Sequence, residues 1–263
     1  MTTKLFERLV TKFSIKVADL IKYLEISKDI ISVLDDMKSN WDRYPDYLGW
    51  FDLNGPIIEH PDILFIGINQ GPGRYLQWNW DNWDEKQKML IDPAKNKLPD
   101  DFPTLWRSRL QWLMPNNARE NGEWWEENKT KKNFFPYYMC ELLVRIYRRE
   151  YPNESRENLT NIFEQRVMAT NLYPMSTFDT KALHRLLDSY YKTTGVDLKK
   201  LCSDRVVELI KMVKPHCVVL LGDSIKDEFA KEYSDYCISR KHGWHGKENI
   251  RNLANDIYHL MNS

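Results

Sequence analysis

Three short segments of the sequence carry amide or imidazole side chains suited to holding a small polar group, and two of them also contain glycine. The first is 61–75, PDILFIGINQGPGRY, whose apolar run at 63–66 is typical of a strand buried on both faces of a parallel sheet. Gly67 and Gly71 then permit the tight turns and close backbone approach that a ligand needs at the carboxyl end of such a strand. We expect Asn69, the first polar side chain past the strand, to point into the crevice there. The alternative is an ordinary Gly/Pro turn after a core strand.

The second segment, 167–175, has the sequence VMATNLYPM and predicts another buried strand that ends at Asn171, with Pro174 stopping it. An Asn amide offers a donor and an acceptor in one plane, so it can satisfy paired complementary groups on one ligand edge. The alternative is that Asn171 caps the helix expected to begin near Asp179.

The third segment, 236–246, ends in RKHGWHG and carries two histidines at a predicted strand end. An imidazole there can donate a hydrogen bond to an atom on which negative charge develops, and His242 and His245 are both candidates. Trp244, between them, has a large, flat side chain suited to inserting between stacked rings. The alternatives are a surface histidine pair without a role and a tryptophan that anchors the loop to the core.

The surrounding patterns predict the elements that must position these segments. Alternating strands and helices imply a parallel sheet, so we predict an α/β fold, a three-layer α/β/α sandwich with a short, mainly parallel central sheet. Strands are expected at 63–66, 167–171 and 217–222, and helices at 137–149, about 179–191, 197–213, around 225–229 with Asp223 or Ser224 as cap, and 247–261.

The chain before the first strand has a helical pattern of its own. Apolar residues recur at three- and four-residue spacings between residues 5 and 41, which predicts two amphipathic helices. We expect residues 1–55 to form an N-terminal helical elaboration on an α/β core of residues 56–263, all within a single domain of 1–263.

Each of the three segments resembles a motif of the uracil-DNA glycosylase superfamily. GINQG at 67–71 is similar to the G-x-N-P-G motif of the mismatch-specific and single-strand-selective branches, with Gln70 in the place of Pro. NLYP at 171–174 is similar to the N-L-x-P segment of the single-strand-selective branch. The superfamily places a catalytic His at the end of its final strand, usually in an H-P-S-P-like motif. His242 matches in position, with GWHG in place of Pro-Ser, so His245 remains a rival.

The resemblance implies a monofunctional DNA glycosylase that hydrolyses the N-glycosidic bond of a flipped pyrimidine and leaves an abasic site, without a metal or other cofactor. Asn69 would position the hydrolytic water, Asn171 would read the Watson-Crick edge of the base, and His242 or His245 would hydrogen-bond the base oxygen that gains charge. The other residues expected around the base are Gly67, Ile68, Gln70, Gly71 and Tyr75.

Gly71 bears on the substrate. In uracil-specific members of the superfamily a Tyr at the equivalent position crowds the carbon-5 side of the pyrimidine. This chain is therefore expected to accept pyrimidines beyond uracil, and a 5-modified cytosine of phage DNA would suit a role in antiviral defence.

Lys and Arg together number 38, as do Asp and Glu, so contact with DNA must come from a local patch. We expect no membrane segment, and a cytoplasmic monomer that binds DNA through a flipped nucleotide. The four cysteines are scattered without a C-x-x-C pair, which argues against a zinc or iron-sulfur site. The residues expected to contact DNA are Lys131, Lys132, Arg240, Lys241 and Trp244, with Arg145, Arg148 and Arg149 adding charge.

Two rival functions remain open from the sequence. A non-catalytic nucleic-acid-binding module on a glycosylase scaffold would bind DNA without making abasic sites. An unrelated doubly wound nucleotide or nucleoside hydrolase would act on free nucleosides and have little affinity for DNA.

Overall fold

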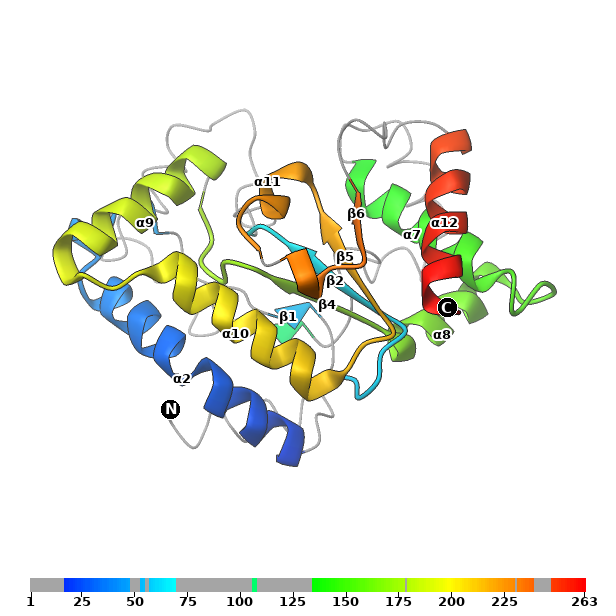
Figure 1. Ribbon diagram of the computed structural model, residues 1–263, viewed down its shortest axis with the longest axis horizontal. Coiled ribbons are helices and arrows are strands. Elements are labelled where there is room, and N and C mark those ends of the chain that lie inside the picture. The colour runs from blue at the N-terminus through cyan, green and yellow to red at the C-terminus, as the bar shows by residue number, and fades with distance from the viewer. Residues whose placement is uncertain are drawn as a thin grey trace.

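A mainly parallel sheet forms the centre of the computed structural model, which describes residues 17–47, 53–54, 57–69, 106–107, 134–177, 179–229, 231–238 and 247–263. The strand order is β3-β1-β4-β2-β5-β6. Four adjacent strands are all parallel: β4 (Val167–Asn171), β2 (Ile63–Gly67), β5 (Cys217–Leu221) and the edge strand β6 (Tyr236–Ile238) (Figure 1). Two short strands extend the β4 edge: β1 (Leu53–Asn54), antiparallel to β4, and β3 (Trp106–Arg107), parallel to β1.

Strand β2 is the central strand, and its apolar run explains its place. It pairs with β4 on one side and β5 on the other, so Ile63 lies opposite both Val167 and Cys217. Its side chains alternate between the two faces of the sheet: Leu64 and Ile66 join one core cluster, while Ile63 and Phe65 join the other. All four are fully buried, which confirms the predicted strand with two covered faces.

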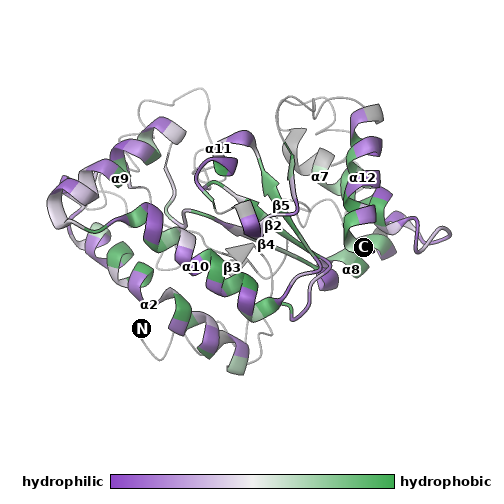
Figure 2. Cartoon of the chain, in the orientation of Figure 1, coloured by the Kyte–Doolittle hydropathy of each residue, from purple (hydrophilic) through white to green (hydrophobic). Residues whose placement is uncertain are grey.

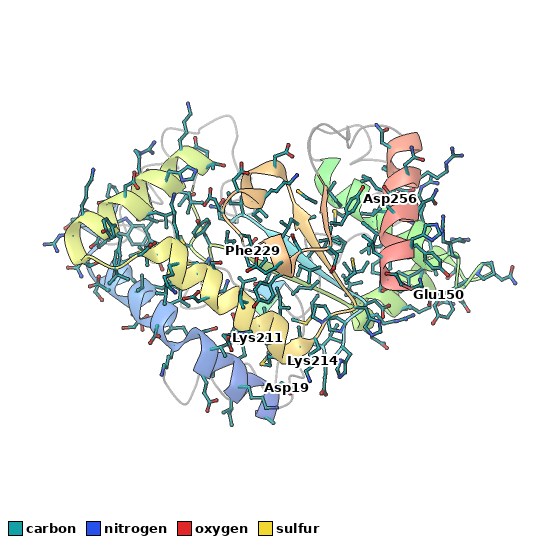
Figure 3. All side chains as sticks on the ribbon, in the orientation of Figure 1. Asp19, Glu150, Lys211, Lys214, Phe229 and Asp256 are labelled. Atoms are coloured by element: carbon teal, nitrogen blue, oxygen red, sulfur yellow. The ribbon has the colours of Figure 1, made fainter. Side chains whose placement is uncertain are left out.

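Helices α2 (Val17–Ser39), α9 (Thr180–Thr194) and α10 (Leu198–Val213) cover one face of the sheet (Figure 1). Each of the last two begins at an aspartate cap: Asp179 accepts from the Ala182 amide, and Asp197 accepts from the Lys200 amide. The short helix α11 (Asp223–Lys226) contributes Ile225 to the same cluster, and Phe229 beyond it is also buried there (Figure 3).

The opposite face carries α7 (Phe134–Tyr147), α8 (Arg156–Arg166) and α12 (Lys247–Met261). Helix α7 packs against both α8 and α12. Figure 2 shows apolar colour along β2, β4 and β5 and mixed colour on the helices, as expected when helices turn one face to the sheet and one to solvent. The molecule is thus a mixed α/β fold with helices on both faces of its sheet.

Several sequence predictions need correction. Residues 17–39 form one continuous helix, while residues 5–16, the earlier part of the region predicted to hold two helices, lie outside the described residues, so the second helix stays a prediction. Neither Asp223 nor Ser224 caps α11, because Gly222 holds the cap position without a side-chain hydrogen bond, and the helix stops before Phe229.

Other elements were not predicted. Strands β1 and β3 are only two residues long each, too short for an alternation pattern. Helix α8 was missed because its buried apolar residues are few, with Leu159 and Phe163 one turn apart, although Ser155 accepts from the Asn158 amide as an N-cap. The 3-10 turns at Trp41–Arg43 and Lys231–Tyr233 were also not predicted.

Within the described part of the chain, no helix has both the length and the apolar character needed to cross a bilayer. The four cysteines are free thiols, and three of them are buried. Burial raises the pKa of Cys140 and of Cys217 to about 12, which keeps both thiols protonated at neutral pH.

A partly buried ionic network holds the amino end of β2 to the α7–α8 layer. The Asp62 carboxylate accepts from the Tyr147 hydroxyl at 2.7 Å and pairs with Arg166 Nε at 2.7 Å. Arg166 also pairs with Glu150 at 2.8 Å. Burial, reinforced by the Asp62 carboxylate, raises the pKa of Tyr147 above its ordinary value, so its hydroxyl remains a donor. The network therefore fixes where β2 enters the sheet.

Replacing Tyr147 with Phe removes only the hydroxyl that donates to Asp62. We expect the free energy of unfolding to fall by about 2 kcal/mol, because a buried hydrogen bond to a charged acceptor is lost. Urea denaturation measures the change, with Tyr191→Phe as the control because Tyr191 is exposed. Equal stability of the two variants would contradict a stabilising role for this network.

Candidate functional site

The candidate site lies where β2 and β4 end side by side. Gly67 and Asn171 form the last pair of the parallel register between the two strands, so the segments that follow both strands leave the sheet at the same carboxyl edge. Two hydrogen bonds continue the contact past the strands: the Leu172 amide donates to the Gly67 carbonyl at 2.7 Å, and the Tyr173 amide donates to the Ile68 carbonyl at 2.8 Å. The segments 67–69 and 171–173 are therefore joined along their backbones.

Gly67 leaves space for the side chain of Asn171. A Cβ built on Gly67 would lie 2.7 Å from Asn171 Oδ1, which is shorter than van der Waals contact allows. Gly67 has no positive φ, so the reason for glycine here is this close approach and not backbone conformation. The Asn171 side-chain amide therefore packs directly against Gly67, the last residue of β2, and Asn171 is only 6% exposed.

The Asn69 side chain is oriented by a directed chain of hydrogen bonds. Asn69 Nδ2 donates to Thr177 Oγ1 at 2.8 Å, and Thr177 Oγ1 donates in turn to the Asp179 carbonyl at 2.9 Å. Because the Thr177 hydroxyl uses its proton on Asp179, it can only accept from Asn69. This fixes the amide orientation. Among the described residues the Asn69 Oδ1 atom has no hydrogen-bond partner, so it can accept a bond from water or a ligand.

Arg205 on α10 hydrogen-bonds to the backbone at the end of β4. Its Nη2 donates to the Asn171 carbonyl at 2.6 Å and to the Leu172 carbonyl at 3.3 Å, and its Nη1 donates to the Tyr23 hydroxyl of α2 at 3.2 Å. Arg205 is only 3% exposed. The backbone that carries Asn171 is therefore bound to the helical layer by a buried cation.

Tyr173 gives the same segment a second attachment. Its hydroxyl donates to Glu228 beyond α11, and His184 Nε2 of α9 lies 3.7 Å from the other oxygen of that carboxylate. Burial, followed by the hydrogen bond to Glu228, raises the pKa of Tyr173 above its ordinary value, so the phenol stays protonated. The NLYP segment is thus held at its backbone and at the tyrosine.

The described residues contain part of the predicted site. Gly67, Ile68, Asn69 and Asn171 lie together at the carboxyl edge, and Asn171 ends a strand while Asp179 caps α9, which excludes the capping alternative for Asn171. The predicted base-pocket and catalytic residues Gln70, Gly71, Tyr75, His242 and His245, and the predicted DNA contacts Lys131, Lys132, Arg240, Lys241 and Trp244, lie outside the described residues.

Sequence reasoning missed Arg205, although a signal was present. Leu198, Cys202, Leu209 and Val213 mark the inward face of α10, and Arg205 falls on the same three- and four-residue spacing. A charge in an apolar stripe requires a buried partner. The role of Thr177 was also missed, because its contact with Asn69 spans 108 residues of sequence, which no local pattern shows.

Within the described ranges, no group of three or more His, Cys, Asp or Glu side chains is arranged to hold a metal ion. The chemistry that these residues offer is hydrogen bonding by amide groups at the carboxyl edge of a parallel sheet, where α/β folds bind ligands. The chain was compared with models of protein families, with curated proteins and with solved structures, and none of the three comparisons found a match.

Gly67→Ala tests the contact between the two strand ends. The added methyl group would force the Asn171 side chain to move, while the backbone of β2 can remain in place because no positive φ is involved. We expect the side-chain amide resonances of Asn171 to shift clearly in NMR spectra of a folded protein.

Gly195→Ala is the matched control, because Gly195 has φ +75° and no atom within 4 Å of its added Cβ. This control should lose about 1 kcal/mol of stability through backbone strain and leave the Asn171 resonances unchanged. Unchanged Asn171 resonances in Gly67→Ala would contradict the close contact.

Arg205→Met tests the buried clamp under Asn171. The variant leaves two carbonyls and the Tyr23 hydroxyl without their guanidinium donor, so we expect the free energy of unfolding to fall by about 2–4 kcal/mol. Tyr23→Phe removes only one of these bonds and should cost about 1 kcal/mol. Chemical denaturation measures both changes, and a loss in Arg205→Met no larger than that in Tyr23→Phe would contradict the clamp.

Proposed function

We propose that this chain is a DNA glycosylase that hydrolyses the N-glycosidic bond of a flipped pyrimidine. One observation carries the proposal: residues 67–69 and 171–174, the described parts of the two segments that resemble glycosylase motifs, meet at the carboxyl edge of adjacent parallel strands, with Gly67 opposite Asn171. About 100 residues of sequence separate these segments. If each resembled a glycosylase motif only by chance, there would be no reason for the two to lie side by side.

Asn171 would recognise the base. A flipped pyrimidine presents donors and acceptors side by side on its Watson-Crick edge, and a planar amide can complement such a pair. Recognition requires that the amide be held in one place. The backbone of Asn171 is restricted by the strand pairing and by the Arg205 bonds to the Asn171 and Leu172 carbonyls. Its side chain is restricted by close contact with Gly67.

Asn69 would orient the attacking water. The bond from Nδ2 to Thr177 fixes which way the amide faces, so Oδ1 would accept a hydrogen bond from the water and turn the lone pair of that water away from itself. The water oxygen bonds to the sugar C1′ while the C1′–N bond breaks and its electron pair leaves with the base. An amide removes protons poorly, but an electrophilic sugar cation does not require a strong nucleophile. The water's proton passes to solvent.

His242, or His245, would stabilise the departing base. Both follow β6, which is the last strand of the described chain and ends at Ile238, and both precede α12. A donor near the base oxygen lowers the barrier because it acts on charge that appears only as the bond breaks.

The substrate class follows from Gly71. A glycine at this position leaves the carbon-5 side of the pyrimidine without a blocking ring, so the pocket would accept 5-substituted pyrimidines as well as uracil. A 5-modified cytosine of phage DNA is the substrate that would make the chain a defence enzyme.

Asn69→Ala is the direct test. Purified protein is incubated with oligonucleotides that contain uracil or 5-modified cytosine, and abasic sites are converted to strand breaks with alkali. We expect cleavage by the wild type, a fall of about 100-fold in Asn69→Ala because the water loses its orientation, and no change in Asn161→Ala, an exposed asparagine on α8. His242→Ala and His245→Ala, assayed in parallel, show which of the two histidines stabilises the departing base.

Two outcomes would overturn the proposal. DNA binding without abasic sites on any substrate would indicate a binding module, and release of bases from free nucleosides alone would indicate a nucleoside hydrolase. Thr177→Val refines the test, since loss of the hydroxyl acceptor should lower kcat while leaving KM nearly unchanged.

A further inference from the structure

A groove rich in arginine lies between α7 and α12, in the helical layer opposite α2, α9 and α10. It has a volume of about 400 Å³. Asp256 on α12 and Glu150 just after α7, both labelled in Figure 3, belong to the same layer. The residues that line this arginine groove are Glu141, Val144, Arg145, Arg148, Arg149, Arg251, Ala254 and Asn255.

The arginine groove has an excess of positive charge. Four of its lining residues are arginines and one, Glu141, is acidic. Glu141 pairs with Arg156, which lies outside the groove lining, so it does not neutralise the four. The nearby carboxylates are also engaged: Glu150 pairs with Arg166, and Asp256 accepts from the Tyr236 hydroxyl. Within the described residues none of the four arginines forms an ion pair.

Arg149 is held in place without an ion-pair partner among the described residues, and Arg145 has a buried donor group. The Arg149 guanidinium lies over the Tyr258 ring, 4.7 Å from its centroid, and its Nη2 donates to Asn255 Oδ1. Stacking and one amide bond leave the remaining donors of Arg149 available. Arg145 is half-buried, and its Nε has no acceptor among the described residues. A buried donor without an acceptor is costly unless a ligand supplies one.

The charges are distributed along the groove. Arg145 and Arg148 are three residues apart on and just after α7, while Arg251 lies across the groove, four residues from the start of α12. At 1.5 Å per residue, Arg251 is about 6 Å along the helix from Lys247, which follows the histidine segment directly. Cations spread along a groove match a chain of phosphates better than one isolated anion.

We propose that the arginine groove binds the phosphate backbone of DNA. Guanidinium groups bind phosphates bidentately, and phosphate contacts provide most of the sequence-independent affinity of a DNA-binding protein. The overall charge of the chain is balanced, so such a local patch is what DNA binding requires. This inference extends the proposed function by naming the surface that holds the DNA.

The test is the salt dependence of binding to a fluorescein-labelled DNA duplex that contains only ordinary bases, so that no base is excised. In Arg148→Gln/Arg251→Gln we expect about tenfold weaker binding at 0.1 M salt, and a slope of log K against log salt smaller by about 2 than that of the wild type. Arg148→Lys/Arg251→Lys keeps both charges and should keep the wild-type slope.

The matched control is Lys192→Gln/Lys199→Gln, which removes two exposed cations from α9 and α10 on the other side of the sheet. Its slope should equal that of the wild type. An equal loss in the groove variant and this control would show only a general effect of net charge and overturn the proposal, as would unchanged binding in the groove variant or no duplex binding by the wild type.

Base release separates this inference from the proposed function. If the chain is a glycosylase and the groove holds DNA, the groove variant should raise KM about tenfold with kcat unchanged on a uracil oligonucleotide. If cleavage depends on Asn69 but the groove variant leaves KM unchanged, the proposed role of the groove is refuted and the glycosylase proposal stands. Duplex binding that depends on the groove, without base release on any substrate, would refute the glycosylase alone.

Discussion

The parallel pairing of β2 with β4 is the constraint on which the rest of the structure depends. Because Gly67 and Asn171 end their strands in register, the two polar segments that follow leave the sheet together. The amides of Leu172 and Tyr173 then bond to the carbonyls of Gly67 and Ile68, so the segments stay joined after the strands have ended. A shift of register by one residue would turn Asn171 to the other face of the sheet and separate it from Gly67.

Buried polar groups make this junction rigid. A carbonyl at the end of a strand has lost its ladder partner, and burial without a partner would cost free energy. Arg205 supplies donors to two such carbonyls at once and links them to Tyr23 on α2. The N-terminal helix is therefore more than a cover for the sheet, because its tyrosine helps to hold the cation that supports Asn171. The same hydrogen bonds therefore stabilise the fold and fix the geometry of the candidate site.

Much of the fold could be predicted from the sequence, because the strands are buried on both faces and read as continuous apolar runs. The runs ending at Gly67, Asn171 and Leu221 became β2, β4 and β5, and the closing helix has the predicted bounds. Of the site, Asn69 and Asn171 were identifiable from position and type. Arg205 and the role of Thr177 were not, since their meaning comes from contacts across 34 and 108 residues.

The two helical layers differ in their chemistry, and this difference explains how a chain without net charge can be suited to a polyanion. On the α10 side, exposed lysines pair with nearby carboxylates along the helix, as Lys200 does with Asp204 and Lys211 with Glu208. On the α7 and α12 side, Glu141 pairs with Arg156, Glu150 pairs with Arg166, and Asp256 accepts from the Tyr236 hydroxyl. The groove arginines are thereby left in excess. Local pairing, and not composition, determines where a balanced protein presents its charge.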